Sequence, residues 1–254
     1  MPILRVEHVF RRFGGLEALH DVSFGLSEGQ IKALIGPNGA GKTTLFNLIS
    51  AVDHPSDGHI YFGEHDLAVI KAHNASRLGI GRTFQHSKLF DDLSVLDNVK
   101  IGRHGKSRAG LMSASLTLPR HRREEREITE ASFTALGRVG LGEMAAEMAG
   151  NLPLGDRHLV EIARALATEP QVLLLDEPAA GLNNEETDRL ETIVRRIRDE
   201  GVTVLLVEHD MGFVMNISDD VVVLDYGRKI AEGPPLMIQN DEEVIRAYLG
   251  EDMV

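Results

Sequence analysis

The chain has 254 residues, 43% of them hydrophobic, which is enough for one large domain or two small ones, and its lack of cysteine excludes disulfides and thiolate chemistry. A formal net charge of −12 argues against nucleic-acid binding, because nucleic-acid-binding proteins usually carry a basic face. With no secretion pattern at the N-terminus and no apolar run near the roughly 20 residues of a membrane-spanning helix, we expect a soluble chain that reaches a membrane only through a partner.

The first part of the chain contains short β-like segments. They are Ile3–Phe10, Val22–Leu26, Gln30–Ile35 and His59–Phe62. The turn residues Ser27–Gly29 separate the second and third segments, so we predict that these two strands pair antiparallel.

A glycine-rich run follows the strand Gln30–Ile35 and precedes residues with helical spacing, which are Leu45, Leu48, Ile49 and Val52. The run consists of Gly36, Pro37, Asn38, Gly39, Ala40, Gly41, Lys42, Thr43 and Thr44. It fits G-x-x-x-x-G-K-[ST], a loop whose backbone N–H groups wrap nucleotide phosphates at a helix N-terminus. We predict that Lys42 contacts the β- and γ-phosphates and that the Thr43 hydroxyl ligates Mg²⁺.

Residues from about 87 to 168 have few strand signals and two helical patterns. The first pattern comprises Ile128, Ala131, Ala135, Leu136 and Val139 and ends at Gly140. The second comprises Leu159, Ile162, Ala163 and Leu166 and ends before Pro170. We interpret this region as a helical insertion into a parallel α/β core.

The last third of the chain has the pattern of a strand–helix–strand unit. Two continuous apolar strands, Val172–Leu175 and Val202–Val207, are typical of a sheet that is covered on both faces. The helical residues between them are Leu190, Ile193, Val194 and Ile197, and Gly201 ends that helix. A hairpin over Val221–Ile230 completes the sheet.

Acidic residues and a histidine follow the two apolar strands, at the sheet edge where ligands bind in open α/β folds. We predict that Asp176 holds Mg²⁺ through a water beside Thr43, and that Glu177 takes a proton from an attacking water. His209 is placed to hydrogen-bond the γ-phosphate or that water. The alternatives are that the acidic pair only forms a turn and that His209 is a solvated side chain.

Several motifs stand in a fixed order along the chain: the glycine-rich loop, Arg82–Gln85, Leu152–Arg164, Leu175–Pro178 and His209. In order and spacing they resemble the ATP-binding-cassette (ABC) ATPases over essentially the whole chain. The resemblance implies an α/β fold with a P-loop NTPase (RecA-like) core, an antiparallel β-subdomain and a helical insertion subdomain. Residues 1–254 would form one domain, with the β-subdomain and core over about 1–86 and 169–254 and the helical subdomain over about 87–168.

The same resemblance assigns ligands to further residues. ATP and Mg²⁺ would bind, Gln85 would sense Mg²⁺ and the γ-phosphate, and Phe13 would stack on adenine. Without the resemblance, Phe13 would be interpreted as a core residue.

The resemblance also identifies a signature segment, which in the family binds the γ-phosphate held by the opposite subunit. Its residues are Leu152, Pro153, Leu154, Gly155 and Asp156, where family members usually carry L-S-G-G-Q. Pro153 removes a hydroxyl and a backbone N–H, and a hydrogen bond to a charged group is worth about 1.5–3 kcal/mol. Like charges about 5 Å apart repel by about 3 kcal/mol at an effective dielectric of about 20, so Asp156 disfavours phosphate unless Arg157 pairs with it or it turns away. Alternatively, Asp156 only caps the helix and Gly155 alone serves the nucleotide.

The D-loop implied by the resemblance is Gly181, Leu182 and Asn183, with Asn183 where Asp is common. Asparagine keeps hydrogen bonding and loses the charge, so we expect the coupling between the two nucleotide sites to be altered.

Four runs resemble the ATPase subunits of branched-chain amino-acid importers: Gly79–Gln85, Leu93–Val99, Asp176–Asn183 and Ala247–Glu251. The resemblance implies ATP hydrolysis at the cytoplasmic face of the inner or plasma membrane. The implied partners are a second ABC ATPase subunit (a heterodimer, given the altered signature), two transmembrane permease subunits and an extracytoplasmic substrate-binding protein, with no nucleic acid. Lipopolysaccharide-export and urea/amide-type ATPases, a soluble ABC ATPase of iron–sulfur assembly, and a nucleotide-binding module without turnover are the alternatives.

Overall fold

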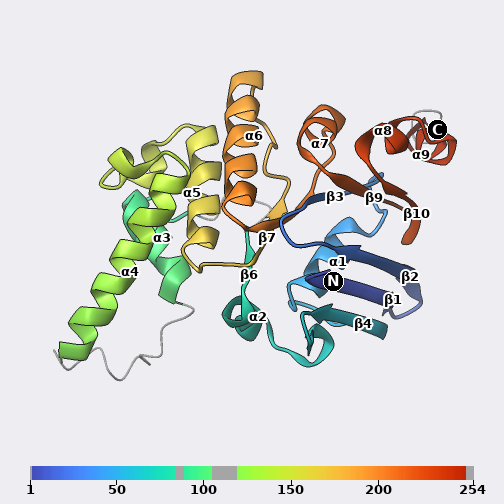
Figure 1. Ribbon diagram of the computed structural model, residues 1–254, viewed down its shortest axis with the longest axis horizontal. Coiled ribbons are helices and arrows are strands. Elements are labelled where there is room, and N and C mark those ends of the chain that lie inside the picture. Colours follow the sequence, from blue (N-terminus) through green and yellow to red (C-terminus); the bar gives the residue numbers. More distant parts are fainter. Residues whose placement is uncertain (1, 84–88, 105–118, 250–254) are drawn as a thin grey trace.

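Two β-sheets organise the chain, and the computed structural model describes residues 2–83, 89–104 and 119–249 (Figure 1). The strands are β1 (Leu4–Phe13), β2 (Leu16–Leu26), β3 (Ile31–Ile35), β4 (Asp57–Phe62), β5 (His65–Asp66), β6 (Ile80–Arg82), β7 (Val172–Asp176), β8 (Thr203–Val207), β9 (Asp220–Asp225) and β10 (Arg228–Gly233). One sheet has the order β10-β9-β3-β8-β7-β6, and the other has the order β2-β1-β4-β5. All pairs of the larger sheet are parallel except β9–β10, and all pairs of the smaller sheet are antiparallel.

Helices cover both faces of the larger sheet and extend beyond its β6 edge (Figure 1). They are α1 (Lys42–Ile49), α2 (Ala72–Leu78), α3 (Val95–His104), α4 (Pro119–Arg138), α5 (Leu154–Leu166), α6 (Asn184–Asp199), α7 (Met211–Ile217), α8 (Pro235–Gln239) and α9 (Glu242–Leu249). Single 3₁₀ turns span Leu67–Val69, Gly142–Met144 and Ala149–Asn151. In the part of the chain that the structure describes, no helix combines the length and apolarity needed to cross a membrane.

The central strands are buried at every residue because both faces of the sheet are covered. Successive side chains of a strand point to opposite faces of the sheet, so alternate residues of these strands pack into two different hydrophobic cores. On β7, for example, Leu173 and Leu175 pack with residues of α5, α6 and α7, whereas Val172 and Leu174 pack with α1 and the antiparallel sheet. Figure 1 shows these two layers on opposite sides of the larger sheet.

Helices α3, α4 and α5 gather at one end of the molecule, beyond β6 (Figure 1). The predicted stripe on α4 is buried at Ile128, Ala135 and Leu136, and the predicted stripe on α5 is buried throughout. Ala131 of the first stripe is only half-buried. The described residues of the region predicted as helical therefore form helices that pack on one another.

The strand–helix–strand unit and the final hairpin are confirmed. Strands β7 and β8 pair in parallel and are connected through α6, and β9 pairs antiparallel with β10. The four residues predicted to form the buried stripe of this helix are its buried residues. Hydrophobic periodicity was sufficient here because the unit is regular and local.

The predicted pairing of Val22–Leu26 with Gln30–Ile35 is wrong. Strand β2 pairs with β1 in the smaller sheet, and β3 pairs with β8 and β9 in the larger one. The turn between them is fixed on the larger sheet, where the Gly29 N–H donates to Thr203 Oγ1 at 3.0 Å. A short turn therefore connects two sheets here. The nearly continuous apolar sequence of β3, which is buried at every residue, was the signal that this strand lies at the centre of the larger sheet.

The helical spacing predicted after the glycine-rich run is wrong at its last residue, Val52. The helix ends at Ile49, Ala51 adopts a φ of 54°, and Val52 is exposed. Strand β6, which has only three residues, was not predicted because so short a segment shows no period.

Candidate functional site

The glycine-rich loop has the backbone that its sequence requires. Gly36, Gly39 and Gly41 have φ values of 145°, 79° and 99°. A Cβ on Gly36 would lie 2.0 Å from the Leu224 carbonyl oxygen, and one on Gly41 would lie 2.8 Å from that of Ala18. Helix α1 begins immediately after Gly41 and has no side-chain cap, and a helix N-terminus of this kind favours anions.

Lys42 holds its ammonium group against this loop. Its Nζ donates to the carbonyl oxygens of Gly36 at 2.5 Å and Pro37 at 2.8 Å. Thr43 is exposed, and Thr44 is half-buried beside it. The loop, a cation and a hydroxyl therefore share one helix N-terminus, which suits a phosphate group.

Asp176 ends β7 at the same edge of the sheet as the loop, because β3 and β7 lie parallel on either side of β8. Its side chain is 1% exposed, and its Oδ2 accepts a hydrogen bond from Arg82 Nη2 at 3.1 Å. Its backbone N–H donates to Thr83 Oγ1 at 3.2 Å. The carboxylate is thus fixed in place and buried.

The residues present fit Mg²⁺. Among the described ranges no group of three or more His, Cys, Asp or Glu side chains could hold a metal. Mg²⁺ needs only one or two protein oxygens when a nucleotide phosphate and water supply the rest, and Asp176 and Thr43 are donors of that hard type. Gln85, the third predicted metal residue, lies outside the described residues. His54, His59, His65 and His73, whose spacing in the sequence shows no metal-ligand pattern, are exposed.

Glu177 adopts a left-handed backbone conformation, with a φ of 48°. That conformation costs a non-glycine residue about 1–2 kcal/mol. The Glu177 N–H donates to the Val207 carbonyl at 2.9 Å, and the Ala180 N–H donates to the Glu177 carbonyl at 3.2 Å, which holds the strained turn. Such strain concentrates at functional sites. Here the strained backbone sets the direction in which the half-buried carboxylate of Glu177 leaves the end of β7.

His209 follows β8 and has an exposed side chain, whereas the residue before it, Glu208, is buried. Glu208 accepts hydrogen bonds from the backbone N–H groups of Ala179 at 2.8 Å and His209 at 3.0 Å. Burial raises the pKa of Glu208, and these hydrogen bonds act in the opposite direction. Sequence reasoning missed Glu208, which fastens the segment after Glu177 to the segment that carries His209. An acidic residue at the end of a fully apolar strand was the available signal.

Phe13 is not a core residue, so that interpretation is wrong. It ends β1, its ring is 46% exposed, and the guanidinium of Arg11 lies 4.4 Å from the ring centroid. Arg11 in turn pairs with Asp53 at 2.8 Å. The ring is held by a cation–π contact and can stack on a planar base.

The signature segment begins helix α5, with Pro153 at the N-cap and Leu154 as first residue. Asp156 turns into the protein, where its Oδ1 accepts a hydrogen bond from Arg189 Nη1 of α6 at 2.7 Å. Arg157 instead pairs with Asp91 at 2.7 Å. Asp156 therefore turns away, and its neutralising cation is Arg189. Sequence reasoning missed Arg189 because it lies 33 positions away on another helix.

The start of α5 packs on the predicted D-loop and on α6. A Cβ on Gly155 would lie 2.8 Å from Glu186 Oε1, and a Cβ on Gly181 would lie 3.2 Å from Leu154 Cδ2. Asn183 caps α6 in a reciprocal capping box with Glu186. Leu182, which lies between Gly181 and Asn183 in the sequence, is half-buried. The two predicted motifs thus form one packed unit.

Known proteins match this chain along almost its full length. A family model described as ABC transporter matches residues 19–180, and one described as branched-chain amino acid ATP-binding cassette transporter matches residues 228–254. The high-affinity branched-chain amino acid transport ATP-binding proteins LivG of Salmonella typhimurium and BraF of Pseudomonas aeruginosa are 44% and 42% identical, and each match covers 98% of both chains.

Solved structures also match this chain over almost its full length. A crystal structure of the ADP conformation of an ABC-transporter cassette superposes with a TM-score of 0.87 at 33% identity, covering 98% of this chain and 99% of that one. A nucleotide-free cassette superposes with a TM-score of 0.86 at 32% identity and the same coverage.

Proposed function

The chain belongs to the ABC transporter family of ATP-hydrolysing subunits, and we propose that it powers the import of branched-chain or other apolar amino acids. One observation carries the proposal: identity of 42–44% to branched-chain amino acid transport ATP-binding proteins extends over 98% of the chain. The match of residues 228–254 to a branched-chain amino acid transporter model supports the same substrate class independently of the core motifs.

The site suggests a role for each residue in the hydrolysis of ATP. The loop Gly36–Thr44 holds the phosphates, and Lys42 exchanges its loop carbonyls for β- and γ-phosphate oxygens. Glu177 accepts the proton of the attacking water, and the exposed His209 hydrogen-bonds the γ-phosphate or that water. Asp176 and Thr43 would hold Mg²⁺, which would supply positive charge against the developing phosphoryl charge.

We propose that adenine stacks on Phe13 and that Gln85 senses Mg²⁺ and the γ-phosphate. Residues 1–254 would act as one ABC ATPase domain whose helical subdomain spans about 87–168.

The partners follow from the signature segment. Arg189 neutralises the charge of Asp156, so the repulsion expected from sequence is reduced, but Pro153 still removes a hydroxyl and an N–H from the phosphate-binding end of α5. We therefore propose that this chain pairs with a different ABC ATPase subunit that carries an intact signature. Two permease subunits and an extracytoplasmic substrate-binding protein complete the importer, and the chain lies at the cytoplasmic face of the membrane through the permeases.

The substrate class is tested by transport. Proteoliposomes that contain the chain with its permeases, second ATPase and binding protein are expected to take up radiolabelled leucine only when ATP is supplied. A matched preparation with Lys42→Ala should take up none. ATP-dependent uptake of urea without uptake of leucine, isoleucine or valine would contradict the proposal.

A further inference from the structure

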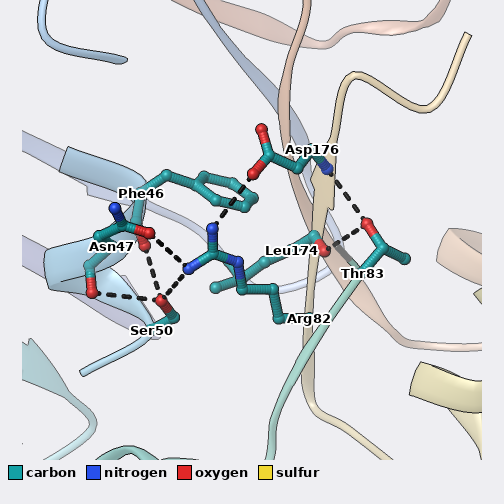
Figure 2. A network of polar contacts seen from close by, with 7 residues as sticks. All are labelled: Phe46, Asn47, Ser50, Arg82, Thr83, Leu174 and Asp176. Atoms are coloured by element: carbon teal, nitrogen blue, oxygen red, sulfur yellow. Dashed lines mark hydrogen bonds and ion pairs between the residues drawn. The ribbon is translucent and has the colours of Figure 1, made fainter. Parts of the chain in front are cut away.

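Arg82, the last residue of β6, joins two parts of the nucleotide site (Figure 2). Its Nη1 donates to Asn47 Oδ1 at 2.8 Å and to Ser50 Oγ at 2.6 Å, at the end of α1. Its Nη2 donates to Asp176 Oδ2 at 3.1 Å. The guanidinium also lies 4.9 Å from the centroid of the Phe46 ring. A single side chain thus ties the helix of the phosphate loop to the carboxylate at the end of β7.

The carboxylate that Arg82 contacts is the one proposed to hold Mg²⁺. Asp176 is 1% exposed, and a buried charge of this kind is costly unless a cation or hydrogen-bond donors compensate it. The guanidinium of Arg82 compensates the negative charge of Asp176. Mg²⁺ held by Asp176 would be a second cation on the same carboxylate, and it and Arg82 would repel each other.

We propose that Arg82 is a positioning residue that serves as the counter-cation of Asp176 and, by opposing Mg²⁺ there, sets the Mg²⁺ concentration at which the nucleotide site loads. The inference rests on the nucleotide site of the proposed function. Because coupling between two ligands of one group is reciprocal, removing one cation strengthens the binding of the other.

A cavity beside Arg82 gives the guanidinium room to withdraw. It has a volume of about 500 Å³, and its wall includes Ser50, Arg82, Phe90, Ile101 and Arg164. The side chain of Arg82 is 18% exposed, so one part of it reaches this space while another contacts Asp176. Arg82 can therefore yield its place on Asp176 without unfolding β6.

The test measures Mg²⁺ affinity, not turnover. Fluorescent mant-ADP is bound to the full chain in EDTA, and Mg²⁺ is then titrated while fluorescence anisotropy is recorded. Arg82→Met, which keeps the length of the side chain and removes its charge, should lower the half-saturating Mg²⁺ concentration about fivefold. Arg82→Lys, which keeps the charge, should remain near the wild type.

Arg103→Met is the matched control. Arg103 is 20% exposed and donates to the Ala167 carbonyl at 2.9 Å while it pairs with Glu169 at 2.9 Å, so it loses a comparable set of bonds. Its Mg²⁺ titration should equal that of the wild type.

An unchanged or raised Mg²⁺ requirement in Arg82→Met would overturn the inference, because a merely structural role weakens the site or leaves its metal affinity alone. Arg82→Gln, which still offers a donor to Asn47, replaces Arg82→Met if the latter does not fold. If mant-ADP failed to bind the wild type with or without Mg²⁺, the nucleotide site itself would be refuted.

Discussion

The ion pair between Asp156 and Arg189 offers a direct test of how this chain tolerates a carboxylate in its signature segment. Arg189→Met removes the cation that contacts Asp156, whose side chain is 10% exposed. Removing one partner of a fully buried pair costs about 3–5 kcal/mol. Because Arg189 itself is 47% exposed, solvent screens the pair, and we expect a loss of about 1–2 kcal/mol in the free energy of unfolding.

The assay is a double-mutant cycle in urea at neutral pH, with Arg189→Met, Asp156→Asn and the double variant. We expect a coupling energy of about 1 kcal/mol, since the two side chains are in contact. The pair Arg157–Asp91 is the control, because Asp91 is largely exposed and such pairs contribute about 0.5 kcal/mol or less. Additive single variants at 156 and 189 would refute the reasoning.

The same variants have a functional consequence. Arg189→Met removes the partner that neutralises Asp156 and holds it inward. If the signature segment binds the phosphate of the opposite subunit as proposed, ATP-dependent association with the second ATPase should therefore weaken about tenfold. Asp156→Asn in the same chain should restore it. Failure of that rescue, with both variants folded, would show that the charge of Asp156 does not act on the phosphate of the opposite subunit.

Three further predictions concern the core of the site. Burial raises the pKa of Glu208 above its ordinary value of 4.5, so the stability due to the protonated side chain is complete below that pH and is lost as pH rises through the raised pKa. Glu208→Gln should flatten this part of the curve of unfolding free energy against pH, and identical curves would contradict it. Gly36→Ala places a Cβ 2.0 Å from a carbonyl oxygen and should abolish mant-ADP binding. Gly39→Ala carries the backbone strain of a φ of 79° but meets no atom within 4 Å, so it should weaken binding far less; equal effects would speak against the loop geometry. Phe13→Ala should weaken mant-ADP binding about tenfold through lost stacking, with little change in stability because the ring is half exposed; unchanged affinity would remove Phe13 from the site.

Local patterns in the sequence predicted the regular parts of the fold. The buried stripe of α6 and the apolar strands β7 and β8 repeat with periods that a single segment displays. The phosphate loop was equally visible, since its glycines are required by backbone geometry within nine residues. Pairing between segments is not visible in this way: the turn at Gly29 predicts antiparallel pairing of β2 with β3, whereas it connects two sheets.

Three contacts around the site that the sequence did not reveal join residues far apart in the chain. Arg82 meets Asp176 across 94 positions, and Arg189 meets Asp156 across 33. Glu208 reaches Ala179 across 29 positions, between two neighbouring strand ends. These side chains position the predicted site residues, and only the order of strands and helices in space brings them together.

The central claim is that this chain supplies a competent nucleotide loop and depends on a different subunit for an intact signature. It is tested most directly by sedimentation of the Glu177→Gln chain with ATP and Mg²⁺, alone and mixed with the second ATPase of the transporter. We predict that the chain alone remains monomeric at micromolar concentration and that the mixture forms an ATP-dependent heterodimer. A tight ATP-driven homodimer of this chain alone would contradict the account.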